Sequence, residues 1–133
     1  MKSLLLALSA IFCFQGVALV AQDAPANPRE KIETAVPEMI RMLEKKEHLK
    51  FIEQFAPPKV VESIKSDQKL EEFAKGFGDK LAPALLKALN EIKGTKPEMS
   101  DDGKKATFTL KEEIANKKTL VLEKVEKYWY IAN

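Results

Sequence analysis

The sequence predicts an α+β protein in which N-terminal helices pack on one face of a C-terminal antiparallel sheet of three or four strands. Three observations predict this fold class. Apolar residues recur at helical spacing up to Gly94, they alternate with polar residues beyond it, and Asp102-Gly103 is typical of a tight hairpin turn. Helices followed by a strand meander are typical of the α+β class, and we expect one domain over residues 28–133.

The start of the chain has the pattern of a secretory signal peptide. Lys2 is the only charged side chain before an apolar run that extends from about Leu4 to Val20. We therefore expect residues 1–21 to be a signal peptide and the protein to be exported, either to a periplasm or as a secreted protein. Residues 22–27 are small and polar and are expected to form a disordered spacer.

Small residues near the end of the apolar run allow cleavage after Ala18, Ala21 or Ala24, and the pattern does not choose among these sites. An uncleaved N-terminal membrane anchor is the alternative, whereas the cleaved chain is expected to make no stable membrane insertion. Cys13 is the only cysteine and lies inside the apolar run. The mature chain is therefore expected to contain no disulfide and no cysteine metal site.

The first helix is expected over residues 28 to about 46. Asn27 can cap it and Pro28 suits its first position. Its apolar stripe is formed by Ile32, Val36, Met39 and Leu43. Because Pro37 falls inside this stripe, we expect one kinked helix.

The second helix is expected to end at Pro57-Pro58, because a residue before proline avoids helical dihedral angles. Its apolar side is formed by Leu49, Ile52 and Phe55, with Phe51 near the edge. A short helix over residues 58–64 should follow.

Two more helices are expected before Gly94. Ser66-Asp67 should cap the first of them, Gly76 and Gly78 should interrupt it, and Asp79 should cap the second. The apolar positions of the two helices are Leu70, Phe73, Ala74 and Phe77, then Leu81, Leu85, Ala88, Leu89 and Ile92.

Beyond Gly94 the apolar period is two. Residues 95–99 are expected to form an edge strand, where Pro97 is acceptable. A half-buried strand should follow the Asp102-Gly103 turn, with Ala106, Phe108 and Leu110 facing inward. A looser turn is expected over residues 112–117, and two further strands should pair through a turn at residues 126–127.

Two stretches, LEKKEHLKFIEQFAPP (residues 43–58) and TLVLEKVEKYWYIAN (residues 119–133), resemble small exported bacterial proteins of unassigned function. The shared pattern is a Phe-x-x-x-Phe-x-Pro-Pro segment after an early helix, then further helices and a hairpin that ends near Trp-Tyr-Ile. Such proteins are similar to simplified members of the nuclear transport factor 2-like, or cystatin-like, superfamily. The resemblance implies helices packed into the concave face of a curved sheet. It implies no function, because that superfamily includes enzymes, binding modules and scaffolds.

The residues that carry most enzyme chemistry are sparse and scattered. His48 is the only histidine and lies among charged neighbours, which favours a surface side chain over a general base. Glu112 and Glu113 are adjacent on an extended segment and face opposite ways, so they cannot flank one bond as glycosidase carboxylates do. A hairpin turn explains Asp101-Asp102 better than a calcium loop does. We expect no catalytic residue, no metal site and no cofactor.

The charge balance argues against a nucleic-acid partner. The chain has 22 basic and 20 acidic residues, which alternate in short stretches such as EKKEHLK. Nucleic-acid surfaces and polybasic membrane patches need clusters of one sign. The alternation is typical of a solvated surface.

The candidate binding residues are three consecutive aromatic residues near the end of the sequence, Tyr128, Trp129 and Tyr130, together with Phe108. Trp129 should share one face of the last strand with Ile131, and Tyr128 should share the other with Tyr130. We expect Trp129 to be a core residue; the alternative is that it lines an apolar pocket with Phe108. The two tyrosines, with Val121 and Val125, could form an outer-face patch for a partner or for a homodimer through the sheet.

We therefore predict an exported, non-enzymatic binding or accessory protein whose partner is an unknown protein or a small apolar ligand. The alternative is an enzyme of unrecognised type that acts on a small apolar ligand in the cone between the helices and the sheet. An open cavity with an ionisable group would favour the enzyme. A cavity filled by Trp129, Phe108 and Leu85 would favour a scaffold.

Overall fold

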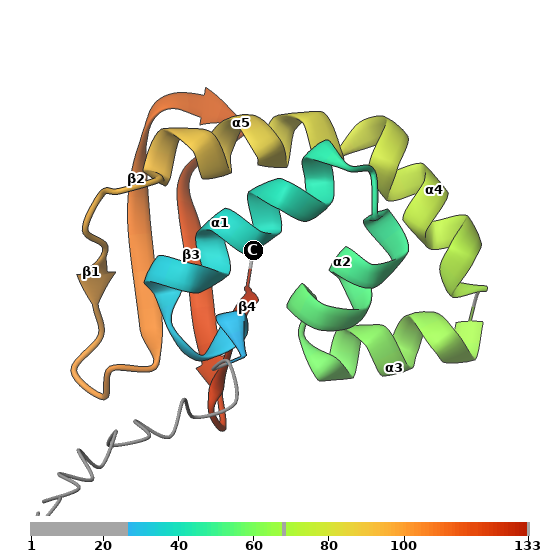
Figure 1. Cartoon of the computed structure of the whole chain (residues 1–133), viewed down its shortest axis with the longest axis horizontal. Helices are drawn as coiled ribbons and strands as arrows, with labels where there is room; N and C mark the ends of the chain where they lie inside the picture. The colour runs from blue at the N-terminus through green and yellow to red at the C-terminus, as the bar shows by residue number, and fades with distance from the viewer. Residues whose placement is uncertain (1–26, 68, 133) are drawn as a thin grey trace, which may run out of the picture.

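The computed structural model describes residues 27–67 and 69–132 (Figure 1). The expected signal peptide (residues 1–21), its three candidate cleavage sites, Cys13 and most of the expected spacer lie outside the described residues. The α+β prediction is confirmed, since the helices come first in the chain and a four-stranded antiparallel sheet follows them.

In the described chain all helical elements come first, and the strands of the sheet follow them. The helical elements are η1 (Pro28–Glu30, a 3-10 turn), α1 (Ile32–Glu44), α2 (His48–Phe55), α3 (Pro58–Asp67), α4 (Leu70–Lys80) and α5 (Ala82–Ile92). The strands are β1 (Glu98–Met99), β2 (Lys105–Ile114), β3 (Lys117–Val125) and β4 (Tyr128–Ile131), in the spatial order β1-β2-β3-β4.

The break in the first helix lies at Lys31, so the prediction of one kinked helix over residues 28–46 is wrong. Asn27 caps η1 as predicted, since its Oδ1 accepts a hydrogen bond from the Arg29 N–H at 3.1 Å. Lys31 then adopts extended angles (φ −127°, ψ 141°). Pro37 lies inside α1, where a proline costs about 3 kcal/mol. Burial of several large apolar side chains of α1, each contributing about 1.5–3 kcal/mol, outweighs that cost.

The buried side of α2 is rotated from the predicted one. Phe51, Ile52 and Phe55 are buried, whereas Leu49 is only half-buried. The reason is a tertiary contact: the ring of Phe77 on α4 stacks on Phe51, with centroids 5.5 Å apart. The neighbouring helix therefore decides which side of α2 is covered.

Three predicted helix boundaries are wrong between residues 58 and 82. Ser66-Asp67 ends α3 instead of capping α4, and the Ser66 hydroxyl donates to the Ser63 carbonyl at 2.8 Å. Gly76 and Gly78 lie inside α4, which continues through Asp79 to Lys80. Local propensity favours a break at these glycines, but packing of α4 against α2 and α5 keeps the helix continuous.

The sheet follows the predicted alternation but has a tighter central turn. Ala106, Phe108 and Leu110 are buried on β2, as predicted. Gly103 has a φ of +69°, which the Asp102-Gly103 turn requires. The loose turn predicted over residues 112–117 is wrong, because β2 extends to Ile114 and only two residues, Ala115 and Asn116, connect it to β3. Both have positive φ, as in a two-residue hairpin of the right twist.

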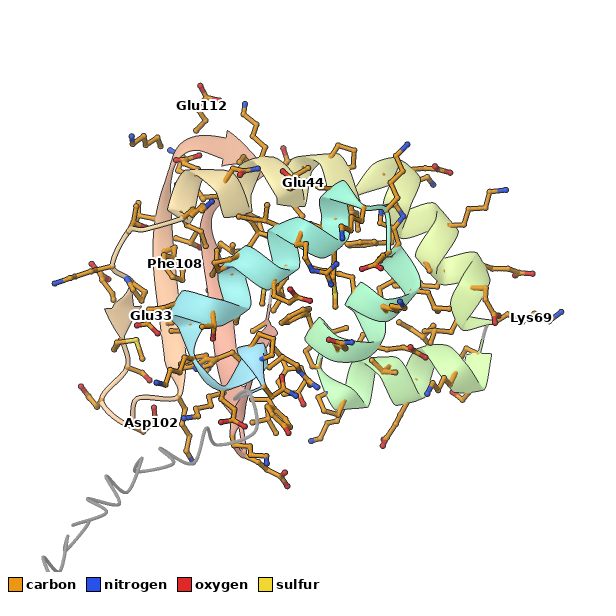
Figure 2. The ribbon with its side chains drawn as sticks, viewed as in Figure 1. Glu33, Glu44, Lys69, Asp102, Phe108 and Glu112 are labelled. Carbon is orange, nitrogen blue, oxygen red and sulfur yellow. The ribbon has the colours of Figure 1, made fainter. Side chains whose placement is uncertain are left out.

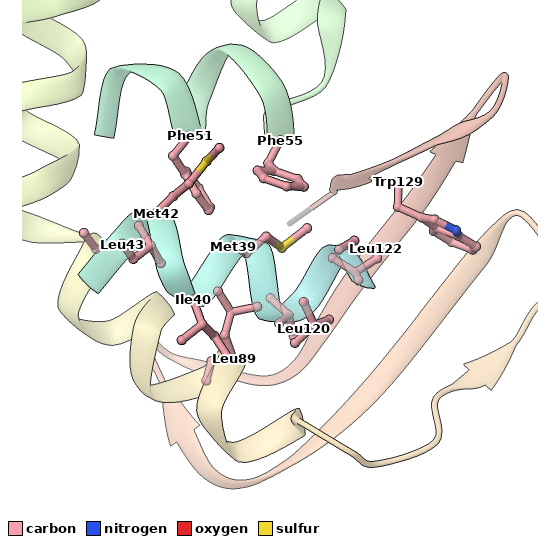
Figure 3. Packing of buried hydrophobic residues seen from close by; sticks show 14 of the residues in the cluster. Met39, Ile40, Met42, Leu43, Phe51, Phe55, Leu89, Leu120, Leu122 and Trp129 are labelled. Atoms are coloured by element: carbon pink, nitrogen blue, oxygen red, sulfur yellow. The ribbon is translucent and has the colours of Figure 1, made fainter. Parts of the chain in front are cut away.

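The core lies between the inner face of the sheet and the helices that cover it (Figure 3). α5 packs against β2 and α1, and α2 packs against β4, whereas α3 and α4 pack mainly against other helices. Figure 3 shows Met39 of α1 in the same cluster as Phe55 of α2 and Leu122 of β3, all with almost no exposed surface. No buried polar or charged residue occurs among the described residues, so apolar burial dominates the stability of the fold.

The two glycines of α4 should respond oppositely to alanine. A Cβ at Gly76 meets no atom, so Gly76→Ala should stabilise the protein by about 0.5–1 kcal/mol. A Cβ at Gly78 would overlap the ring of His48, which lies edge-on to Phe77 at 6.0 Å, so Gly78→Ala should destabilise by about 1–3 kcal/mol. Denaturant unfolding of both variants measures the difference.

His48→Ala provides the control for this pair. In that background the overlapping ring is absent, and Gly78→Ala should become stabilising like Gly76→Ala. Equal stabilisation by both alanines in the unmodified chain would show that the His48 ring moves aside freely.

Candidate functional site

An open groove of about 720 Å³ lies between the start of α1, the end of α5 and the sheet. We call it the Trp129 groove. Its apolar lining is formed by Ile32, Val36, Pro37, Ile92, Pro97, Met99, Phe108 and Trp129. Its charged lining is formed by Glu30, Lys31, Glu33, Lys93 and Lys96. Glu33 at the start of α1 and Phe108 on β2 mark two of its sides (Figure 2).

The groove exists because the chain turns sharply at the end of α5 and pairs with the sheet only several residues later. Thr95 closes the helix end, since its N–H and its hydroxyl both donate to the Ile92 carbonyl, at 2.9 and 2.8 Å. Gly94 has a φ of +78°, a conformation that favours glycine at a helix end. β1 then contains only two residues, so the segment between α5 and β1 borders an open space instead of pairing with β2.

Apolar and charged side chains are separated within the groove. Trp129 is 5 % exposed and forms part of the floor with Phe108, while Met99 is 48 % exposed at one edge. The charged side chains are exposed or half-buried. Among the described residues none of these five charges takes part in an ion pair. Such a surface can remove an apolar group from water while the rim charges stay solvated.

Trp129 and Phe108 therefore lie together, as the pocket alternative for these residues requires. Strand register places Lys124 opposite Trp129, and its Nζ lies 5.9 Å from the indole centroid. Leu85 lies elsewhere, in a second groove, so these three side chains do not fill one cavity.

Tyr128 and Tyr130 lie on the other face of β4, where Arg29 covers them. The Arg29 guanidinium carbon is 4.4 Å from the Tyr128 ring centroid and 5.0 Å from that of Tyr130. Tyr130 is only 7 % exposed, and Lys127 Nζ lies 5.2 Å from the Tyr128 ring. Because Arg29 covers part of both rings, less of this patch is open to a partner. Val125 nearby remains 40 % exposed.

The other ionisable residues considered from the sequence are dispersed. His48 is half-buried between α2 and Gly78 of α4. Glu112 accepts a hydrogen bond from Lys87 Nζ at 2.6 Å, which holds the pKa of Glu112 below its ordinary value. The Ser100 hydroxyl donates to Asp102 and lowers the pKa of that carboxyl. Within residues 27–67 and 69–132, no group of three His, Cys, Asp or Glu side chains could hold a metal ion.

Sequence reasoning missed Arg29, Met99 and the lysines of the rim. The Gly94 signal located the end of α5, but only the fold reveals that the next residues border a groove. The sequence places Arg29 in a first helical turn, and no neighbouring residue indicates that it contacts the last strand.

Comparison with known proteins identifies no relative, since no family model, curated protein or solved structure matches the chain. The resemblance to the nuclear transport factor 2-like superfamily therefore stays a prediction. In the part of the chain that the structure describes, every helix is too short or too polar to cross a membrane.

Trp129→Ala should lower the free energy of unfolding by about 3 to 5 kcal/mol, because the indole is buried against the core. Tyr128→Ala is the matched variant on the opposite face and should lose less, since that ring is half-buried. Chemical denaturation followed by circular dichroism measures both. An almost unchanged melting temperature for Trp129→Ala would exclude a core role.

Proposed function

We propose that the protein is an exported, non-enzymatic binding or accessory protein whose Trp129 groove takes a small ligand with an apolar body. The observation that carries the proposal is the open groove itself, in which the nearly buried Trp129 and Phe108 form the floor and the exposed Met99 lies at the edge.

The size and lining of the groove support this proposal. Small-molecule sites are clefts of about 300–1,000 Å³ with mostly apolar walls and a few polar groups, and a volume of about 720 Å³ lies within that range. Covering the few exposed apolar groups of the groove contributes only about 4 kcal/mol, much of which association itself offsets. The expected affinity is therefore weak, on the order of millimolar or weaker, because a dissociation constant of about 1 mM already corresponds to about 4 kcal/mol.

The enzyme alternative has less support from the same geometry. The groove meets the criterion of an open cavity with ionisable groups, but those groups are exposed or half-buried, whereas the floor residues Trp129 and Phe108 are buried. A reacting group resting on Trp129 and Phe108 would meet aromatic carbon instead of a carboxylate or an imidazole. Binding needs only the floor, whereas general acid–base catalysis needs a positioned proton donor or acceptor within about 3 Å.

Met99→Glu should abolish ligand binding without unfolding the protein. Met99 is half-exposed, so a charge there is tolerated by the fold, but it places a carboxylate at the mouth of the groove. Trp129 is the only tryptophan, so its emission reports directly on the floor. Neutral aromatic fragments titrated into the protein should shift this emission and perturb amide signals of Ile32 and Val36.

Val125→Glu is the matched control, because Val125 is similarly exposed and does not line the groove. It should bind fragments as the unmodified chain does. Fragment binding that survives Met99→Glu, or that Val125→Glu weakens equally, would contradict the assignment of the site. Release of a chemically altered fragment would replace binding with catalysis.

Export is tested separately by the mass of the protein recovered outside the cytoplasm. The mature chain should begin after Ala18, Ala21 or Ala24 and should lack Lys2. Intact mass spectrometry measures the boundary. A membrane-bound product that retains Lys2 would show an uncleaved anchor.

A further inference from the structure

A second groove, of about 310 Å³, lies at the start of α5 on the same face of the sheet. We call it the Leu81 groove. Leu81 and Leu85 line it from the helices, Leu110 and Ile114 line it from β2, and Ile131 lines it from β4. Leu81 joins α4 to α5 and is 49 % exposed, the most exposed of the large apolar side chains that the structure describes.

An irregularity in the sheet shapes this groove. Thr109 pairs with Thr119, but the next pair is Ile114 with Lys117, so β2 contains extra residues in this stretch. Such bulges bend a strand, re-aim its side chains and often lie beside functional sites. Here the bulge precedes the tight turn at Ala115, and both Ile114 and Ala115 line the groove.

The Leu81 groove differs from the Trp129 groove in charge. Lys117 is its only charged lining residue within the described chain, and Lys117 forms no ion pair with any described residue. An apolar cleft with one cation at its edge is complementary to a molecule with a hydrocarbon body and one negative charge. A volume of about 310 Å³ lies at the lower end of the range for small-molecule clefts.

We propose that the Leu81 groove binds a free anionic amphiphile with one hydrocarbon chain, such as a fatty-acid carboxylate, whose headgroup pairs with the Lys117 ammonium. The chain would lie against Leu85, Leu110 and Ile131, and the carboxylate would stay partly in water at the turn. The site is separate from the Trp129 groove and does not depend on a ligand there.

Dodecanoate below its micellar concentration is the probe, measured by isothermal titration calorimetry on the full mature chain. Binding should saturate at one molecule per chain. From octanoate to dodecanoate the affinity should rise roughly fourfold for each added CH₂ that is buried. Lys117→Gln should weaken dodecanoate binding roughly two- to fivefold and leave dodecanol binding unchanged, as expected for a partly exposed ion pair.

Two further variants separate the contributions. Leu81→Gln removes an exposed apolar wall and should weaken dodecanoate and dodecanol alike. Lys118→Glu is the charge control, because Lys118 is the next residue of β3 and does not line the groove. It should bind dodecanoate as the unmodified chain does, while Lys117→Glu should bind it more weakly than Lys117→Gln.

Several outcomes would overturn the inference. Dodecyltrimethylammonium that binds as tightly as dodecanoate would remove the role of Lys117. Loss of dodecanoate binding in Met99→Glu but not in Leu81→Gln would place the probe in the Trp129 groove, which would support the proposed function while excluding this site. Binding only to phosphatidylglycerol vesicles, weakened equally by Lys117→Glu and Lys118→Glu, would show a membrane surface and not a site for a free amphiphile.

Discussion

The packing of α5 across β2 is the contact on which the rest of the structure depends. Leu89 and Ile92 bring almost no exposed surface to it, and Phe108 of β2 belongs to the same buried cluster. No described residue is a cysteine, and the ion pairs among the described residues lie at exposed or half-buried positions, where solvent screens them in part. Apolar burial at this junction must therefore supply most of the free energy that opposes chain entropy. α1 and α2 are positioned because they extend the same apolar layer.

The same junction explains why two grooves exist. Figure 1 shows α5 crossing the strands instead of running along them. A helix is about 10 Å wide, whereas a ten-residue strand such as β2 is about 33 Å long, so one crossing helix covers about a third of it. α1 widens the cover but ends before both margins are closed. The two inward-facing residues of β4 therefore line different grooves. Trp129 lines the Trp129 groove, and Ile131 lines the Leu81 groove.

The features of the fold that depend on only a few neighbouring residues were predicted correctly from the sequence. Gly94, the Asp102-Gly103 turn and the alternation around Phe108 each act within a few residues, and each was found where the sequence indicated. The continuous helix through Gly76 and Gly78 and the buried Phe51 depend on neighbouring helices, which a single sequence does not reveal. The candidate site could be predicted only in part for the same reason. The sequence indicated its aromatic floor residues, but its rim residues depend on how α5 packs against the sheet.

The stacking of Arg29 on Tyr128 and Tyr130 joins the first turn of the described chain to its last strand. During translation this contact has no partner until β4 leaves the ribosome, and the floor of the Trp129 groove is missing for the same interval. The helices are synthesised before the strands, so their apolar faces have no sheet to pack against until the strands follow. The domain can therefore close only once β4 has been synthesised, and until then the apolar faces of the helices are exposed on the nascent chain.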